Sequence, residues 1–209
     1  MIRLLIVRHG LTEWNIQNRY QGQSDIPLSQ IGMSQAGALA ARLKTVAIDQ
    51  IITSDLVRAH ATADYINAGR SIPITVDMLM REMNFGVWEG LTFTQAMAQY
   101  PVESKRWIDQ DYSSAVAGAE TMAQVQSRVQ QFLKSIWIPS NNNTTICVVG
   151  HAGFFGLMLC EALKIDSTNM WKFKFSGASL SEIHLHTGTT VIGLLNDISH
   201  YDPSLTGTV

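Results

Sequence analysis

Two neighbouring residues near the start of the chain, Arg8 and His9, have the side chains needed for covalent phosphoryl transfer. They follow a continuous apolar run over 2–7 and stand directly before Gly10, where the backbone can turn. An arginine presents a planar, charged fork that fits phosphate oxygens, and a neutral histidine nitrogen is a nucleophile near pH 7. The pair suggests a phosphohistidine, although two solvated polar residues at a strand end would give the same local pattern.

Polar side chains also follow two other predicted strands. A strand over 48–53 leads into a helix that carries Arg58 in its first turn, and a buried strand over 145–149 is followed by Gly150-His151. Ligands of open α/β sheets bind beyond the carboxyl ends of the strands. We therefore expect the two arginines and two histidines to meet at one edge of a sheet.

The helix predicted after His151 could itself bind phosphate. Gly150 and Gly153 flank this histidine and allow the backbone to approach a ligand closely. Free N–H groups and a partial positive charge at the helix N-terminus attract anions. The sequence thus predicts a phosphate pocket with focused positive charge.

A departing alcohol needs a proton, and Glu82 is the best candidate donor. It follows an apolar stretch and precedes a glycine turn at Gly86, so we expect it in a partly buried loop. Burial and a nearby phosphate dianion would raise its pKa toward the working range of a general acid. Glu13 and Glu89 are alternatives on the sequence alone.

The elements that must position these residues alternate along the chain, which predicts a three-layer α/β/α sandwich around a mostly parallel central sheet. Residues 8–27 are predicted to form a long functional loop, and a helical insertion over about 92–118 is predicted to roof the site. The predicted strands are 2–7, 48–53, 73–76, 145–149, 179–185 and 190–195. The predicted helices are 30–43 capped by Ser29, 56–67 capped by Ser54-Asp55, 92–112 interrupted at Pro101, 121–137 and 154–163.

Composition limits the classes of partner. The chain has 209 residues, 46% hydrophobic and 15% charged, which fits one domain over 1–209, and its net charge of -2 offers no broad basic surface for nucleic acid or an anionic membrane. No apolar run reaches the length of a membrane span, and the N-terminal run is typical of a first strand rather than a signal peptide. Cys147 and Cys160 are expected to be buried free thiols, which favours a cytoplasmic location.

Four motifs in order give the chain a resemblance to a known family. Together they are similar to the histidine phosphatase superfamily, the phosphoglycerate mutase-like proteins, over nearly the whole chain. The motifs are Arg8-His9-Gly10, Arg58-Ala59-x-x-Thr62-Ala63, Arg81-Glu82 with Trp88-Glu89-Gly90, and Gly150-His151-Ala152-Gly153.

The resemblance implies a phosphoglycerate mutase-like fold and a role for each motif residue. It implies His9 as the nucleophile and Glu82 as the acid that later activates water. It implies that Arg8, Arg58 and His151 bind the phosphate. We expect His151 to be protonated while it does so. Supporting contacts are expected from Asn15, Gln21 and Gly22, and no metal or organic cofactor is expected.

The acid region favours a phosphatase over a mutase. Mutases of this family carry a Glu-Arg-His-Tyr-Gly stretch and a following arginine pair, whereas this chain has Glu82-Met83-Asn84-Phe85-Gly86 and no such pair. The chain resembles the alpha-ribazole phosphatase and broad-specificity phosphatase branch, so the expected substrate is a small phosphorylated metabolite such as alpha-ribazole phosphate or a sugar phosphate. A phosphoglycerate mutase and a non-catalytic phosphate-sensing domain stay open as alternatives. Leu11 and Ala61 depart from the commonest family pattern and leave the substrate preference open.

Several residues have two interpretations each. Tyr100, Trp107 and Tyr112 either pack the roofing helices or contact the ligand, and His200 either closes over the pocket from the tail or lies outside it. His184 shares a strand face with His186, which allows a metal pair, but no third ligand is near in the sequence. The hairpin edge over 179–195 makes a homodimer a further expectation.

Overall fold

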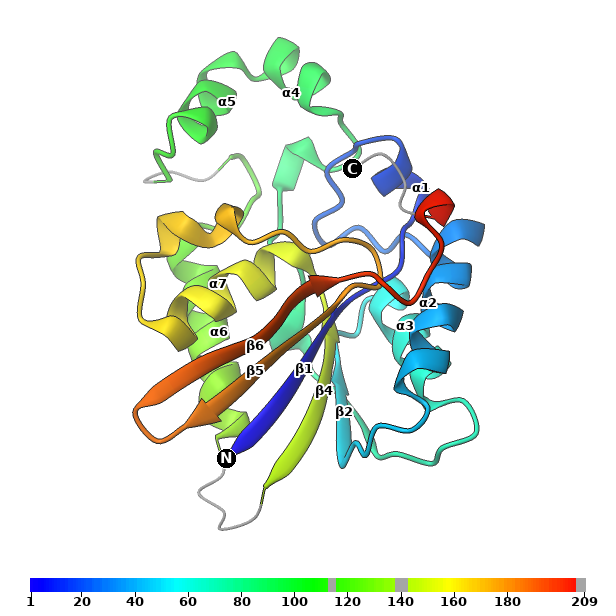
Figure 1. The fold of residues 1–209 in the computed structure, drawn as a ribbon. Coiled ribbons are helices and arrows are strands. Elements are labelled where there is room, and N and C mark those ends of the chain that lie inside the picture. The colour runs from blue at the N-terminus through cyan, green and yellow to red at the C-terminus, as the bar shows by residue number, and fades with distance from the viewer. Residues whose placement is uncertain (113–115, 138–142, 206–209) are drawn as a thin grey trace.

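A six-stranded sheet with the order β3-β2-β4-β1-β5-β6 organises the computed structural model, which describes residues 1–112, 116–137 and 143–205. Strands β1 to β4 run parallel, whereas β5 pairs antiparallel with β1 and β6 pairs antiparallel with β5 (Figure 1). The mostly parallel sheet is therefore confirmed. The strands are β1 (Ile2–Arg8), β2 (Gln50–Thr53), β3 (Ile74–Val76), β4 (Thr144–Gly150), β5 (Leu180–His186) and β6 (Thr189–Asp197).

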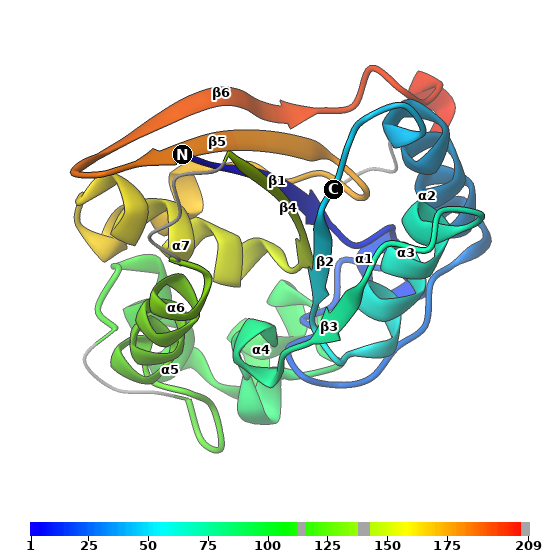
Figure 2. The same ribbon diagram turned by 90° about the horizontal axis from the view of Figure 1, so that it is seen from below.

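Helices cover both faces of the sheet, which confirms the three-layer α/β/α arrangement. Helices α2 and α3 lie on one face and α6 and α7 on the other (Figure 2). The helices are α1 (Glu13–Ile16), α2 (Gln30–Leu43), α3 (Val57–Asn67), α4 (Phe93–Gln99), α5 (Pro101–Ile108), α6 (Met122–Ile136) and α7 (Ala152–Leu163). Short 3-10 turns are η1 (Met78–Met80), η2 (Gly86–Trp88), η3 (Ser167–Lys172) and η4 (Pro203–Leu205).

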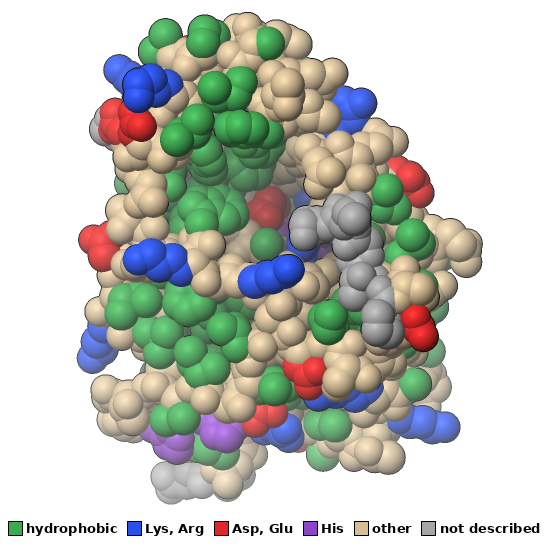
Figure 3. All heavy atoms as spheres, turned by 45° about the horizontal axis from the view of Figure 1, so that its top comes forward, with side chains coloured by type: hydrophobic (Ala, Val, Ile, Leu, Met, Phe, Trp, Pro, Cys, Tyr) green, Lys and Arg blue, Asp and Glu red, His purple; other side chains and the backbone are tan. Residues whose placement is uncertain are grey.

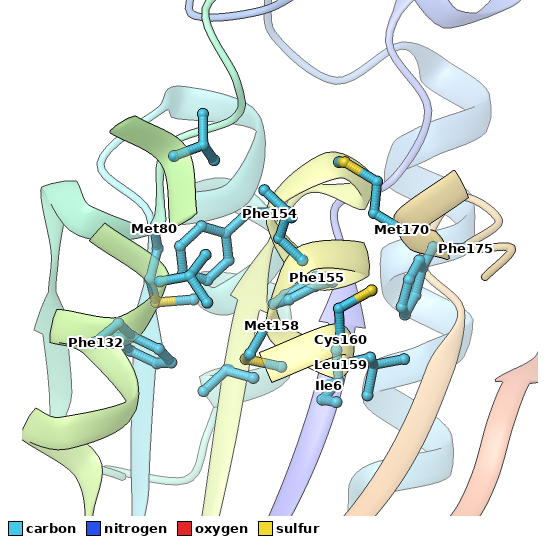
Figure 4. Close-up of a cluster of buried hydrophobic side chains, with 14 of the residues drawn as sticks. Ile6, Met80, Phe132, Phe154, Phe155, Met158, Leu159, Cys160, Met170 and Phe175 are labelled. Atoms are coloured by element: carbon cyan, nitrogen blue, oxygen red, sulfur yellow. The ribbon is translucent and has the colours of Figure 1, made fainter. Parts of the chain in front are cut away.

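Strand β1 is apolar throughout because it is buried on both faces. Leu4 and Ile6 pack into the core under α6 and α7, while Leu5 and Val7 point to the core under α2 and α3. Figure 4 shows the first of these cores, where Phe154 of α7 lies against Phe132 of α6 with ring centroids 5.6 Å apart. Each such fully buried side chain contributes about 1.5–3 kcal/mol, so the two cores fix the strand whose end carries Arg8 and His9.

One helix cap was predicted correctly and one was wrong. Ser29 caps α2, since its hydroxyl accepts a hydrogen bond from Gly32 N at 3.1 Å. Helix α3 has no side-chain cap of its own at its start. Instead Asp25, from the preceding loop, accepts a hydrogen bond from Val57 N at 2.7 Å, and Asp55 pairs with Arg81.

The long loop over 8–27 contains one element that the sequence analysis missed. Thr12 and Asn15 form a capping box for the single turn α1. The Thr12 hydroxyl also donates to Gln21 Oε1 at 2.8 Å. This loop is therefore held by side-chain hydrogen bonds. Because such bonds produce no hydrophobic periodicity in the sequence, α1 could not be predicted from that pattern.

Two short helices stand above the carboxyl ends of the strands. Helices α4 and α5 meet at Pro101, the predicted interruption, and lie over the body of the molecule (Figure 1). Trp107 of α5 makes ring contacts with Phe85, Trp88 and Trp171, at centroid distances of 5.8, 5.7 and 5.9 Å. The predicted roof over 92–118 includes residues 113–115, which lie outside the described residues.

Both cysteines match the prediction, since Cys147 and Cys160 are free and buried, and burial raises the pKa of Cys147 to about 12. Across the described ranges, none of the helices is both long and apolar enough to cross a membrane. Edge strand β6 exposes Val191, Ile192 and Leu195. A dimer at this edge stays a prediction.

Candidate active site

A cleft of about 190 Å³ opens at the carboxyl ends of β1 and β4. The α4–α5 segment lies above these strand ends (Figure 1). Figure 3 shows this part of the surface as a hollow, with hydrophobic side chains above it and charged side chains at its bottom. The cleft brings together almost every residue that the sequence analysis selected. Its lining consists of Arg8, His9, Asn15, Arg19, Tyr20, Gln21, Gly22, Arg58, Glu82, Phe85, Ala152 and Trp171.

His9 is held with one ring nitrogen directed at a backbone acceptor. Its Nδ1 lies 2.7 Å from the carbonyl oxygen of Gly10, and because a carbonyl can only accept, we assign the proton to Nδ1. The other nitrogen, Nε2, then carries a lone pair. Burial and the charges of Arg58 and Arg8 hold the pKa of His9 well below its usual value, so the ring is neutral at pH 7.

Gly10 permits this arrangement because a side chain does not fit there. A Cβ atom would collide with the backbone carbonyl of Gly32, and Gly10 N donates to Thr62 Oγ1 at 3.1 Å. Thr62 belongs to the Arg58-Ala59-x-x-Thr62-Ala63 motif of α3. Two motifs that are distant in the sequence therefore meet behind the His9 ring.

His151 lies next to His9, with the two ring centroids 5.1 Å apart, and it is not among the residues that line the cleft. Its side chain is fully buried, and neither ring nitrogen has a hydrogen-bond partner among the described residues. Burial, followed by the charge of Arg58, holds the pKa of His151 well below its usual value. The mechanism expected from the sequence has His151 protonated while it binds phosphate, and that protonation stays a prediction.

The two site arginines bind main-chain carbonyls. Arg8 Nη1 donates to Phe175 O at 2.5 Å, while Arg58 Nη1 and Nη2 donate to Ser24 O and Gly22 O at 2.8 and 2.7 Å. Neither arginine has an ion-pair partner within 4 Å in the described part of the chain. Burial lowers the pKa of Arg58 to about 10, so it is still a cation at pH 7.

Glu82 occupies the N-terminus of α7. Its carboxylate accepts hydrogen bonds from Met83 N at 2.9 Å, Gly153 N at 3.1 Å and Phe154 N at 3.2 Å. The expectation that these helix N–H groups are free for phosphate is therefore wrong, because a carboxylate already uses them. Gly153 is required here, since a Cβ atom would lie 2.5 Å from Glu82 Oε1.

An ion pair that the sequence analysis missed supports the Glu82 loop. Arg128 of α6 donates to Leu79 O and Arg81 O, both at 2.7 Å, and to Glu82 O at 3.2 Å. Its Nε lies 2.7 Å from Glu120 Oε1, with both side chains largely buried. No motif could have identified Arg128, which occupies an ordinary position on an amphipathic helix.

The two alternative acids do not line the cleft. Glu13 is exposed on α1, and the Glu89 carboxylate is occupied by hydrogen bonds from the backbone of residues 23, 24 and 85. Asn15 and Gln21 do line the cleft, and their side-chain oxygens bind Thr12. Leu11, which departs from the family pattern, is fully buried outside the cleft lining.

The remaining predicted residues lie away from the cleft. His200 lies 3.0 Å from Ala178 O through Nε2, so it does not close over the pocket. His184 contacts Glu182 Oε1 at 2.6 Å, and the described residues hold no group of three side chains that could bind a metal. Tyr100, Trp107 and Tyr112 do not line the cleft.

Three aromatic residues form the apolar part of the cleft wall, and the sequence analysis did not select them. The rings of Tyr20 and Phe85 contact each other at a tilt of 52°, with centroids 5.1 Å apart, and Trp171 of η3 is 43% exposed. Trp107 of α5 contacts both Phe85 and Trp171 from the outer side. The roofing segment therefore supports the wall without lining it.

Comparison with known proteins finds relatives that match nearly the whole chain. A relative named phosphoserine phosphatase 1, from Hydrogenobacter thermophilus, is 33% identical over 204 residues, which is 96% of this chain and 94% of the relative. A Proteus mirabilis relative, "Probable phosphoglycerate mutase GpmB", is 30% identical over 206 residues, covering 96% and 95%. The crystal structure of the alpha-ribazole phosphatase from Shigella flexneri superposes with a TM-score of 0.83 at 26% identity, covering 94% of this chain and 96% of that one.

Phosphatases are prominent among these relatives, in agreement with a phosphoric monoester hydrolase. One family model matches residues 4–198, which is nearly the whole chain. The chain belongs to the histidine phosphatase superfamily (branch 1).

Proposed function

We propose that the protein hydrolyses a phosphomonoester of a small metabolite in two steps, through a phosphohistidine on His9. One observation carries the proposal. The His9 ring directs Nδ1 at Gly10 O, and this leaves an unprotonated Nε2 in a cleft with two arginines, whose hydrogen bonds within the described ranges go to carbonyl groups.

In the first step His9 attacks the phosphate. The Nε2 lone pair forms a bond to phosphorus while the bond from phosphorus to the alcohol oxygen breaks. Glu82 gives its proton to that oxygen, and the alcohol leaves. The products are the phosphohistidine, the Glu82 carboxylate and the free alcohol.

In the second step water attacks the phosphohistidine. Glu82 takes one proton from the water while the oxygen bonds to phosphorus and the phosphorus–nitrogen bond breaks. Inorganic phosphate is released, His9 regains its lone pair, and Glu82 is protonated again. Each cycle therefore restores the starting groups without a cofactor.

The charge on the transferring phosphoryl group is balanced by Arg8, Arg58 and His151. The two guanidinium groups supply fixed positive charge in a buried site, where electrostatic stabilisation is strong. The neutral His151 ring can donate one N–H, and a bound phosphate dianion would counter the arginine charges that now lower its pKa.

The leaving alcohol would face the aromatic wall formed by Tyr20, Phe85 and Trp171. Relatives whose names specify phosphoserine or alpha-ribazole support a small phosphorylated metabolite as substrate. The two buried free thiols support a cytoplasmic location.

His9→Ala is the direct test. We expect this variant to lose hydrolysis of para-nitrophenyl phosphate and to take up no acid-labile label from a radiolabelled phosphomonoester. His60→Ala is the matched control, because His60 lies on the outside of α3 beside Asp64. Full hydrolysis by His9→Ala would overturn the mechanism, and a wild type without phosphohistidine turnover would favour a phosphate-sensing domain.

A phosphoglycerate mutase is the second candidate, because one 30% identical relative carries that name. A mutase would return the phosphoryl group from His9 to the alcohol instead of to water. Interconversion of 2- and 3-phosphoglycerate with a bisphosphate primer, at a rate above that of phosphate release, would establish it. We expect phosphate release to be faster.

A further inference from the structure

We propose that Glu89 is a positioning residue that orients Arg58 through the backbone of residues 22–24. Glu89 does not line the cleft, and this inference rests on the proposed function of the cleft only in assigning Arg58 to the phosphate. The proposal gives a function to the carboxylate of the Trp88-Glu89-Gly90 motif.

The Glu89 carboxylate is saturated by donors from two loops. Oε1 accepts from Gln23 N at 2.9 Å and from Phe85 N at 3.1 Å. Oε2 accepts from Ser24 N at 2.9 Å and from the Ser24 hydroxyl at 2.6 Å. A carboxylate that accepts four such bonds fixes the direction of the peptide groups around it.

The same short segment presents its carbonyl groups to Arg58. Gly22 O and Ser24 O are 2.7 and 2.8 Å from the two terminal nitrogens of Arg58. Gly22 O and Gln23 N belong to one planar peptide group. That group therefore points its N–H at Glu89 and its C=O at Arg58, so the position of one side chain sets the position of the other.

The backbone between them is adapted to this contact. Gly22 has a φ of +52°, a conformation that favours glycine, and a Cβ atom there would collide with Glu89 Oε1. Arg58 is fully buried, and its Nε has no partner among the described residues. The two loop carbonyls are therefore the contacts that determine where its charge lies.

Binding of inorganic phosphate, measured by calorimetry, tests the proposal without requiring turnover. In Glu89→Gln the amide nitrogen would face backbone N–H groups, so we expect the loop to shift and the dissociation constant to rise about tenfold, as for one lost charge-assisted hydrogen bond. Glu13→Gln is the matched control, since Glu13 is exposed and has no side-chain hydrogen bond in the described ranges. Its dissociation constant should equal that of the wild type.

A double-mutant cycle separates positioning of Arg58 from a general effect on the fold. In an Arg58→Ala background, Glu89→Gln should change phosphate affinity less than twofold, because the group it positions is gone. An equal loss in both backgrounds, or a folded Glu89→Gln with wild-type affinity, would overturn the proposal. If Glu89→Gln does not fold, Ser24→Ala removes only one of the four bonds, and the same cycle applies with an expected loss of about threefold.

The two proposals fail separately. A wild type that binds phosphate but forms no phosphohistidine contradicts the hydrolase and leaves the Glu89 cycle interpretable. Conversely, normal hydrolysis with unchanged phosphate affinity in Glu89→Gln contradicts only the positioning role.

Discussion

Replacing Glu82 by glutamine should separate the two steps of the proposed reaction. Glutamine has nearly the same shape but can neither give a proton to an alkoxide nor take one from water. With its amide oxygen in the position of Oε1, it still accepts hydrogen bonds from Met83 N and Phe154 N. Only the bond from Gly153 N, to Oε2, is lost.

The cost in stability can be estimated from that single lost bond. One unsatisfied donor costs about 1–3 kcal/mol. For a chain of this size each kcal/mol lowers Tm by about 2–4 °C. Glu82→Gln should therefore be folded at 25 °C, so a loss of activity reports on chemistry.

The expected loss depends on the leaving group. General acid catalysis contributes about 10²–10⁴-fold, and an alkyl phosphate such as glycerol phosphate should lose that much in its first step. Nitrophenolate leaves without a proton, so its first step should slow by less than about tenfold. Rapid-mixing kinetics should then show a burst of nitrophenolate followed by slow release of phosphate, with phosphohistidine accumulating.

The refuting result is equal slowing of the first step for both substrates. That outcome would mean that Glu82 only holds α7 and donates no proton to the leaving group. Glu103→Gln is a suitable control because Glu103 lies on α5, outside the cleft lining. Glu103→Gln should keep the wild-type rates for both substrates, and the same leaving-group dependence in that variant would show that the assay detects something other than the acid.

Three further outcomes follow from the same geometry. His9 and His151 have folded pKa values below the unfolded value of about 6.5, so below that pH the unfolded state binds more protons than the folded state. As the pH is lowered from about 6.5, the free energy of unfolding, measured in urea, should therefore fall by up to about 1.4 kcal/mol per pH unit for each histidine. Replacing either histidine by glutamine should make this pH dependence less steep. Gly153→Ala should displace the Glu82 carboxylate and reproduce the leaving-group dependence of Glu82→Gln, whereas unchanged alkyl phosphate turnover would contradict the contact. Arg128→Met should lower the unfolding free energy by about 3–5 kcal/mol, because it removes the cation paired with the largely buried Glu120 carboxylate and the donor to the carbonyls of Leu79 and Arg81. A loss of less than about 1 kcal/mol in chemical denaturation would contradict this.

The layers of the fold were predictable because hydrophobic periodicity is a local property. The apolar run of β1 and the stripe of α6 identify a buried strand and an amphipathic helix without tertiary information. The sequence also located Arg8, His9, Arg58 and Glu82 in the cleft. Each of them lies beside an apolar segment or a turn residue whose position can be recognised in the sequence.

The predictions that were wrong concerned contacts between segments that are distant in the sequence. Ser54 and Asp55 have the composition of a helix cap, but Asp25 reaches the first turn of α3 instead. The first N–H groups of α7 were expected to be free, but the carboxylate of Glu82, from a distant loop, accepts hydrogen bonds from two of them. Residue type predicts that a donor will find an acceptor, but it does not predict which one.

The positive charge of the site likewise depends on which arginines are paired with carboxylates, and not on how many basic residues the chain has. The chain has 15 basic and 17 acidic residues, so composition alone would give no reason for an anion to bind. Outside the cleft, three of the described arginines, Arg3, Arg42 and Arg81, are neutralised by carboxylates at 2.5–2.6 Å. Arg8 and Arg58 are instead held by carbonyl oxygens, which fix a guanidinium without cancelling its charge. A phosphate in this cleft would therefore meet two preoriented cations without first displacing a carboxylate, so we expect this weakly acidic protein to bind a dianion here.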